Sequence, residues 1–116
     1  MGGGIPDGAV LVARAITNSS LWTMRMADRI LAITCICMAN WKQKKWFDGE
    51  RANVIERGQF ITSLENLAEA AKLSLQTVRT SMKNLEKVGF LTRKVTHRWT
   101  LVTLCKYDHY QKISNY

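Results

Sequence analysis

Apolar and polar positions between residues 62 and 94 follow a regular pattern that predicts two short helices and then a strand. Each helix has one apolar face, because its aliphatic residues recur at intervals of three and four positions. Those of the first helix are Leu64, Leu67, Ala68 and Ala71, and those of the second are Leu75, Val78, Met82 and Leu85. Two short helices joined by a tight turn are typical of a helix-turn-helix.

Residues with capping chemistry stand at the predicted helix ends. We expect Thr62 to cap the first helix, with Glu65 three positions later completing a capping box. Ser74 would cap the second helix after a turn made by the two residues before it. Gly89 follows the second helix, where a residue in the left-handed conformation commonly ends a helix.

The chain beyond Gly89 predicts a β-hairpin. Residues 90–95 and 99–104 are rich in residues that favour strands, and they flank a short polar tip. A hairpin directly after the second helix is the wing of a winged helix, and a short strand over residues 59–61 would pair with it. The predicted fold class is therefore α+β, a winged helix-turn-helix with a three-helix core and a β-hairpin wing.

The chain before residue 62 would supply the third core helix, from Thr23 to about Asn40. Residues 30–39 are apolar apart from Thr34, which is far short of the roughly twenty residues that a membrane span needs. A helix that is apolar on all sides belongs in a core, and a second subunit would cover its excess apolar surface.

Shorter elements are expected on both sides of this helix. We predict a strand over residues 9–13, a short helix over 14–20, and a buried anchor at Leu21 and Trp22. A second hairpin would span residues 45–55 around an Asp-Gly turn, and a helical turn would close the chain at residues 107–110. With 116 residues the chain forms one domain, predicted over residues 9–111 after a flexible N-terminus over residues 1–8.

Short polar and cationic side chains occupy the second helix away from its apolar face. Such groups contact phosphates and base edges in a major groove. The candidate DNA-binding residues are Ser74, Gln76, Thr77, Arg79, Thr80 and Lys83 on the helix, and Arg93, Lys94, His97 and Arg98 on the hairpin. Ser74 would lie near a phosphate and the hairpin would follow the backbone or the minor groove. The alternative is that this polar face is merely solvated.

The distribution of charge favours an anionic partner. The net charge is +8, and residues 79–98 hold six basic residues against one acidic residue, Glu86. If the excess charges of this segment all met phosphates, log K would fall against log salt with a slope of roughly −4 to −5. A smaller basic cluster consists of Lys42, Lys44 and Lys45.

The sequence lacks the patterns of common catalytic and cofactor sites. It has no glycine-rich phosphate loop and no carboxylate pair suited to magnesium. Its two histidines are twelve positions apart, a spacing that matches no metal site or catalytic triad. Cys35, Cys37 and Cys105 have no metal-binding spacing and are expected to be buried free thiols in a reducing cytoplasm. We therefore expect a cytoplasmic, non-enzymatic protein with no cofactor and no metal.

Four tryptophans could stack on bases. Trp22, Trp41 and Trp46 flank apolar runs and are predicted to lie in the core. Trp99, next to the tip of the wing, stays open as a nucleic-acid contact.

The run GQFITSLENLAEAAKLSLQTVRTSMKNLEKVGFLTRK, followed by RWTLVTL and YDHYQ, resembles the N-terminal winged-helix domain of DnaD-like replication proteins of phages and bacteria. The resemblance implies a role in primosome assembly or helicase loading. The implied partners are double-stranded DNA or its single-stranded form, further copies of the chain, and helicase-loading proteins, with no membrane. Residues 112–116 would then be a C-terminal tail that begins a linker to a further segment.

Two other functions stay open. Residues 74–85 are similar to the recognition helix of GntR-type transcriptional regulators. In DnaD-like proteins, moreover, the winged-helix domain is often an oligomerisation platform, and much of the DNA binding lies in a second domain that has no counterpart in this sequence. A transcriptional regulator and an oligomerisation module that does not bind DNA are therefore the alternatives.

Overall fold

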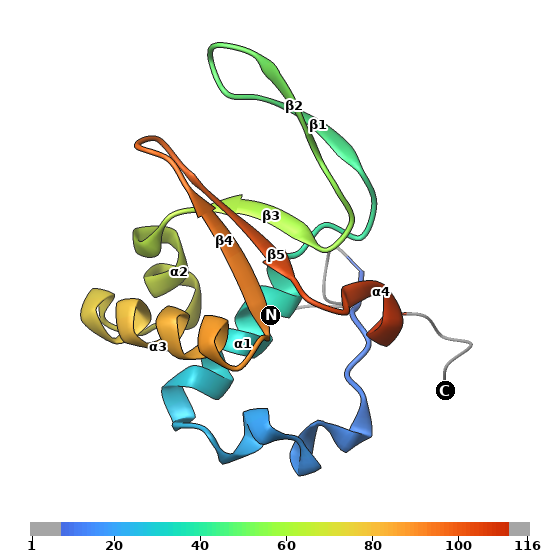
Figure 1. Ribbon diagram of the computed structural model, residues 1–116, viewed down its shortest axis with the longest axis vertical. Coiled ribbons are helices and arrows are strands. Elements are labelled where there is room, and N and C mark those ends of the chain that lie inside the picture. Colours follow the sequence, from blue (N-terminus) through green and yellow to red (C-terminus); the bar gives the residue numbers. More distant parts are fainter. Residues whose placement is uncertain (1–7, 112–116) are drawn as a thin grey trace, which may run out of the picture.

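Three helices and a three-stranded sheet form the body of the molecule, and a second hairpin projects beside the wing (Figure 1). The computed structural model describes residues 8–111. The expected C-terminal tail and all but the last residue of the expected flexible N-terminus lie outside the described residues. The helices are η1 (Arg14–Asn18), η2 (Ser20–Thr23), α1 (Met26–Met38), α2 (Leu64–Ala71), α3 (Leu75–Lys87) and α4 (Tyr107–Tyr110), where η1 and η2 are 3₁₀ helices.

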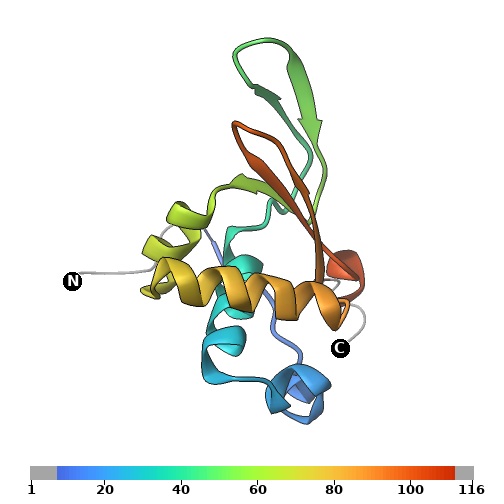
Figure 2. The same cartoon turned by 60° about the vertical axis from the view of Figure 1, so that its left-hand side comes forward.

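The sheet confirms the predicted winged helix. Its strands are β3 (Gln59–Thr62), β4 (Leu91–Val95) and β5 (Thr100–Leu104), in the antiparallel order β3-β5-β4. The wing is the β4–β5 hairpin, and β3 extends it through register pairs from Gln59↔Thr103 to Thr62↔Thr100. Because β3 leads into α2 and β4 leaves α3, the sheet is joined to both ends of the helix-turn-helix (Figure 2).

The apolar faces predicted from sequence meet in one core. Leu67 of α2 and Val78, Met82 and Leu85 of α3 are buried, and Leu75 is half-buried. Buried residues of α1 and the sheet complete this core, namely Leu31, Ala32, Cys35, Phe60, Leu91 and Val102. The central helix is therefore α1, with bounds inside those predicted.

The cap of α2 differs from the prediction by one position. Thr62 is the last residue of β3, so the strand runs one residue further and Ser63 becomes the N-cap. The Ser63 hydroxyl accepts a hydrogen bond from the Asn66 backbone N–H at 3.1 Å. Asn66 therefore occupies the position that a capping box gives to its acidic residue, and the expected pair of Thr62 and Glu65 is wrong.

The C-terminus of α3 ends as the sequence predicts. Gly89 has φ +78°, and its N–H donates to the Glu86 carbonyl at 3.0 Å. The Phe90 N–H donates to the Leu85 carbonyl at 3.0 Å. These two bonds satisfy carbonyl groups that the helix end would otherwise leave without donors, and they turn the chain into the wing.

The N-terminal segment departs from two predictions. Residues 9–13 form no strand. Instead, the Gln111 side-chain amide bonds both backbone groups of Leu11, accepting from its N–H at 2.9 Å and donating to its carbonyl at 2.7 Å. Leu21 is buried as predicted, but Trp22 is exposed and stacks on the Arg29 guanidinium. The helix predicted over residues 14–20 becomes the two 3₁₀ helices, and the closing turn is α4.

The second hairpin forms as predicted and makes a separate two-stranded sheet. It consists of β1 (Lys44–Phe47) and β2 (Ala52–Ile55). The Asp48 carboxylate accepts backbone N–H bonds from Glu50 and Arg51, both at 2.9 Å, which fixes the turn. Within the described residues, no helix is long and apolar enough to cross a membrane.

Candidate nucleic-acid interface

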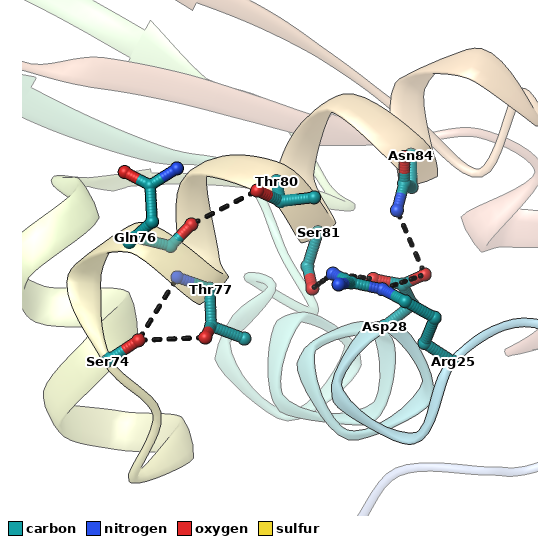
Figure 3. Close-up of polar contacts among 8 residues, drawn as sticks. All are labelled: Arg25, Asp28, Ser74, Gln76, Thr77, Thr80, Ser81 and Asn84. Atoms are coloured by element: carbon teal, nitrogen blue, oxygen red, sulfur yellow. Dashed lines mark hydrogen bonds and ion pairs between the residues drawn. The ribbon is translucent and has the colours of Figure 1, made fainter.

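The outer face of α3 is polar and open. Gln76, Arg79 and Lys83 are exposed, and Thr77 and Thr80 are half-buried. Figure 3 shows Gln76 and Thr80 on the side of α3 away from α1, with the Thr80 hydroxyl donating to the Gln76 carbonyl at 3.2 Å. This leaves the Gln76 amide and the two cationic groups available to a ligand.

Ser74 acts as the N-cap that the sequence predicts. Its hydroxyl accepts from the Thr77 backbone N–H at 3.1 Å and donates to the Thr77 side-chain oxygen at 2.7 Å. The two side chains therefore fix the first turn of α3 (Figure 3). Their main contribution is to hold the N-terminus of the helix in shape, which positions the residues that follow.

The exposed cationic stripe on α3 consists of the predicted Arg79 and Lys83 and, in addition, Lys87. Lys87 lies four positions after Lys83 on the same helical face, and it is exposed. It was missing from the candidate residues although the i, i+4 spacing could have identified it. Among residues 8–111, Arg79, Lys83, Lys87 and Lys94 make no ion pair.

Both arginines of the wing are held in ion pairs within the molecule. Arg93 bonds the Glu86 carboxylate of α3 at 2.8 Å, and its side chain is only 16% exposed. Arg98 pairs with Glu50 of the β1–β2 hairpin at 2.9 Å. Among residues 8–111, Lys94 of the wing has no ion-pair partner, while His97 is exposed near the wing tip.

The β1–β2 hairpin docks on the tip of the wing. The Trp46 and Trp99 rings meet edge to face, with centroids 5.4 Å apart. The Arg98 guanidinium, at the wing tip, also donates to the Asp48 carbonyl, in the hairpin turn, at 3.5 Å. Trp99, which the sequence left open as a base contact, is therefore half-buried against another tryptophan, and Trp46 is half-buried with it.

A buried carboxylate fixes α3 on α1. Asp28, 1% exposed, accepts hydrogen bonds from Arg25 and Asn84, each at 3.1 Å. The Arg25 guanidinium also donates to the Ser81 hydroxyl at 3.1 Å, so this cluster of four residues ties two turns of α3 to the start of α1 (Figure 3). Burial alone would raise the pKa of Asp28. The hydrogen bonds from its partners and the charge of Arg25 outweigh it and lower the pKa below its ordinary value.

The three cysteines differ in exposure, and none of them joins a metal-binding cluster in the described part of the chain. Residues 8–111 contain no group of three or more histidine, cysteine or acidic side chains that could hold a metal ion. Cys35 is buried, which raises the pKa of its thiol to about 12. Cys37 is exposed and Cys105 is half-buried, so the expectation of three buried thiols holds only for Cys35.

Comparison with known proteins points to replication. A family model described as Firmicute plasmid replication protein (RepL) matches residues 48–102, slightly less than half of the chain. The matched segment begins at the turn of the β1–β2 hairpin and runs through the helix-turn-helix into β5. No curated protein and no solved structure matches the chain. The family match supports a replication-initiator family, and it does not single out the DnaD-like type.

Proposed function

We propose that this chain is a non-enzymatic winged-helix domain that binds DNA in the initiation of plasmid or phage replication, in the bacterial cytoplasm. The observation that carries the proposal is the uncovered face of α3. There Gln76, Arg79, Lys83 and Lys87 are exposed, and the three cations have no ion-pair partner among residues 8–111. The replication role is supported by the family match across the helix-turn-helix.

Each exposed side chain has a distinct role in this proposal. α3 enters the major groove, where Arg79 makes a bidentate contact to guanine and Gln76 contacts a base edge. Lys83 and Lys87 bind phosphates on the flanks of the groove, and Lys94 of the wing binds the adjacent backbone. Because Arg93 and Arg98 are already neutralised, three cations meet phosphates, and the salt slope is roughly −3.

A helicase-loading role of the DnaD type is a narrower form of the same proposal. It is supported by the sequence resemblance described above. It would require helicase-loading partners, whereas origin binding alone would not. Pull-down of a host helicase loader by the full chain, with and without DNA, distinguishes the two forms.

We expect replacement of Arg79 by alanine to weaken binding to the preferred duplex by about 1–3 kcal/mol and to relax selection at one base pair. Replacement of Lys83 should instead weaken all sequences alike and make the salt slope shallower by about one unit. The measurement is a fluorescence-anisotropy titration with random and selected duplexes over a salt series.

Arg14→Ala is the matched control for these two variants. Arg14 is an exposed arginine of η1, and this segment lies on the side of the body away from the tip of the wing (Figure 1). Its loss lowers the net charge by the same amount without touching α3. Equal losses from all three variants would mean that binding depends only on total charge, and this result would contradict the assignment of α3.

Replacement of Glu86 by glutamine provides a test in the opposite direction. Glu86 holds Arg93 and is the acidic residue within α3 itself. Its neutralisation frees one cation, so we expect tighter binding and a salt slope steeper by about 0.9. The same titration measures it, and an unchanged slope would show that the wing arginine does not approach the DNA backbone.

One observation favours a second candidate function, an oligomerisation module. Met26, Ile30 and Cys37 lie on one exposed face of α1, and the first two are large apolar side chains in water. The ion pairs of Arg93 and Arg98 also fit a wing that does not meet DNA. Light scattering beside a gel-shift salt series separates the candidates, because a stable dimer without any shift at low salt would favour the module.

A further inference from the structure

Two large aromatic side chains stand in solvent on the segment that leads into the second hairpin. Trp41 is 65% exposed and Phe47 is 66% exposed. The prediction that Trp41 lies in the core is therefore wrong. The chain between them reads WKQKKWF, so aromatic and basic residues interleave over seven positions.

The lysines of this segment are as accessible as its aromatics. Lys42, Lys44 and Lys45 are exposed, and none of them makes an ion pair among residues 8–111. The Lys42 ammonium lies 4.8 Å from the centre of the Trp41 ring, so charge and ring are presented together. Within the part of the chain that the structure describes, β1 pairs only with β2, and no other strand lies along its outer edge.

This combination suits a strand of nucleic acid whose bases are unpaired. Aromatic side chains stack on base faces, and a duplex hides those faces inside its own stack. Nearby ammonium groups neutralise the phosphates that join the bases. We propose that residues 41–47 bind single-stranded nucleic acid, with Trp41 and Phe47 as stacking platforms and Lys42, Lys44 and Lys45 as phosphate contacts.

This site would lie beside the proposed duplex-binding face rather than on it. The Trp46–Trp99 contact and the Arg98–Glu50 ion pair attach the hairpin to the wing, and the two hairpins run alongside each other in both views (Figures 1 and 2). A single body would therefore present a duplex face on α3 and a single-strand site on β1. The proposal does not rest on duplex binding, since it uses none of the α3 residues.

The test is an anisotropy titration of labelled oligo-dT and oligo-rU against the full chain and its Trp41→Ala and Phe47→Ala variants. Loss of one stacking partner should weaken single-strand binding by about fivefold to 100-fold, and the Trp41→Phe variant should recover most of it. Val54→Ala is the matched control, because Val54 is 53% exposed on the same hairpin but has no ring. Circular dichroism should show that all variants fold, as these side chains lie largely in solvent.

The outcomes separate this site from the proposed function. Arg79→Ala should leave oligo-dT binding unchanged even where duplex binding falls, and Trp41→Ala should do the reverse. Preference for oligo-dT or for oligo-rU would assign the site to DNA or RNA, and either supports it. Unchanged single-strand affinity in the Trp41→Ala, Phe47→Ala double variant would overturn the proposal. So would loss of self-association in that variant with no change in single-strand affinity, because the patch would then be a protein contact.

Discussion

Replacing Asp28 by alanine is expected to lower the free energy of unfolding by about 2–4 kcal/mol. The carboxylate is buried and accepts hydrogen bonds from Arg25 and Asn84. Without it, the Asn84 amide loses its acceptor between α1 and α3, and Arg25 keeps only its bond to Ser81. The expected loss is below that for a fully buried ion pair, because the Arg25 side chain is half-exposed and reaches water.

Urea unfolding followed by circular dichroism measures this loss of stability. Two further variants are compared with Asp28→Ala. Glu69→Ala removes the carboxylate of an exposed ion pair with Lys72, which should change stability by at most about 1 kcal/mol. Asp28→Asn keeps an acceptor in place but removes the charge, so its loss should be intermediate. If Asp28→Ala were no worse than Glu69→Ala, the cluster would not hold α3 on α1.

The pH dependence of stability follows from the lowered pKa of Asp28. A carboxyl group whose pKa is lower in the folded than in the unfolded state stabilises the fold at pH values above the unfolded pKa. This contribution is lost as pH falls through the folded pKa, because both states are then protonated. We therefore expect the unfolding free energy of the native chain to decline below about pH 4, near the ordinary aspartate pKa. Asp28→Asn should show a smaller decline over the same range.

The cluster also determines how α3 is presented. Ser81 lies on the side of α3 that faces α1, and the Asn84 side chain reaches down to Asp28, whereas Gln76 and Thr80 lie on the side away from α1 (Figure 3). A helix held on one side by directional bonds keeps a fixed rotation about its axis, and this decides which residues reach a groove. Asp28→Asn removes one negative charge, and this change alone would strengthen binding to duplex DNA. We nevertheless expect the variant to bind duplex DNA more weakly, because it loosens α3.

The sequence predicted the elements whose causes are local. Helices α2 and α3 follow from apolar spacing, the end of α3 follows from Gly89, and the hairpin turn follows from Asp48 and Gly49. Each depends on residues within a few positions of one another. The cap of α2 was displaced by one residue because the pairing of Thr62 with Thr100 across the sheet extends β3, and that contact is not local.

The features that the sequence could not predict depend on contacts between distant segments. Asp28 and Asn84 are 56 positions apart, and nothing near either residue indicates the other. Glu50 and Arg98 meet only because two hairpins lie side by side, so a segment that appears basic in sequence contains two neutralised arginines. Trp41 follows an apolar helix, which in sequence is typical of a core residue. The chain leaves the core at that point, as the exposure of the ring shows.

Gly58→Ala is expected to lower the free energy of unfolding by about 2–4 kcal/mol, for two separable reasons. Gly58 has φ +84°, where a side chain strains the backbone, and a Cβ atom there would lie 2.8 Å from the Tyr107 Cβ. The residue links the second hairpin to β3, and its carbonyl accepts the Leu104 N–H at 3.0 Å. Tyr107 is buried and cannot retreat without opening the core beneath α4.

Gly89→Ala separates the strain from the clash. Gly89 has a similar φ of +78°, but a Cβ atom there would meet nothing within 4 Å. Its replacement should therefore cost only the backbone term, about 1–2 kcal/mol, and the difference between the two variants measures the contact with Tyr107. In a Tyr107→Gly background, which removes the Tyr107 Cβ as well as the ring, the cost of Gly58→Ala should fall to the Gly89→Ala value. If it did not, the close approach of α4 to the start of β3 would not be what requires glycine at position 58.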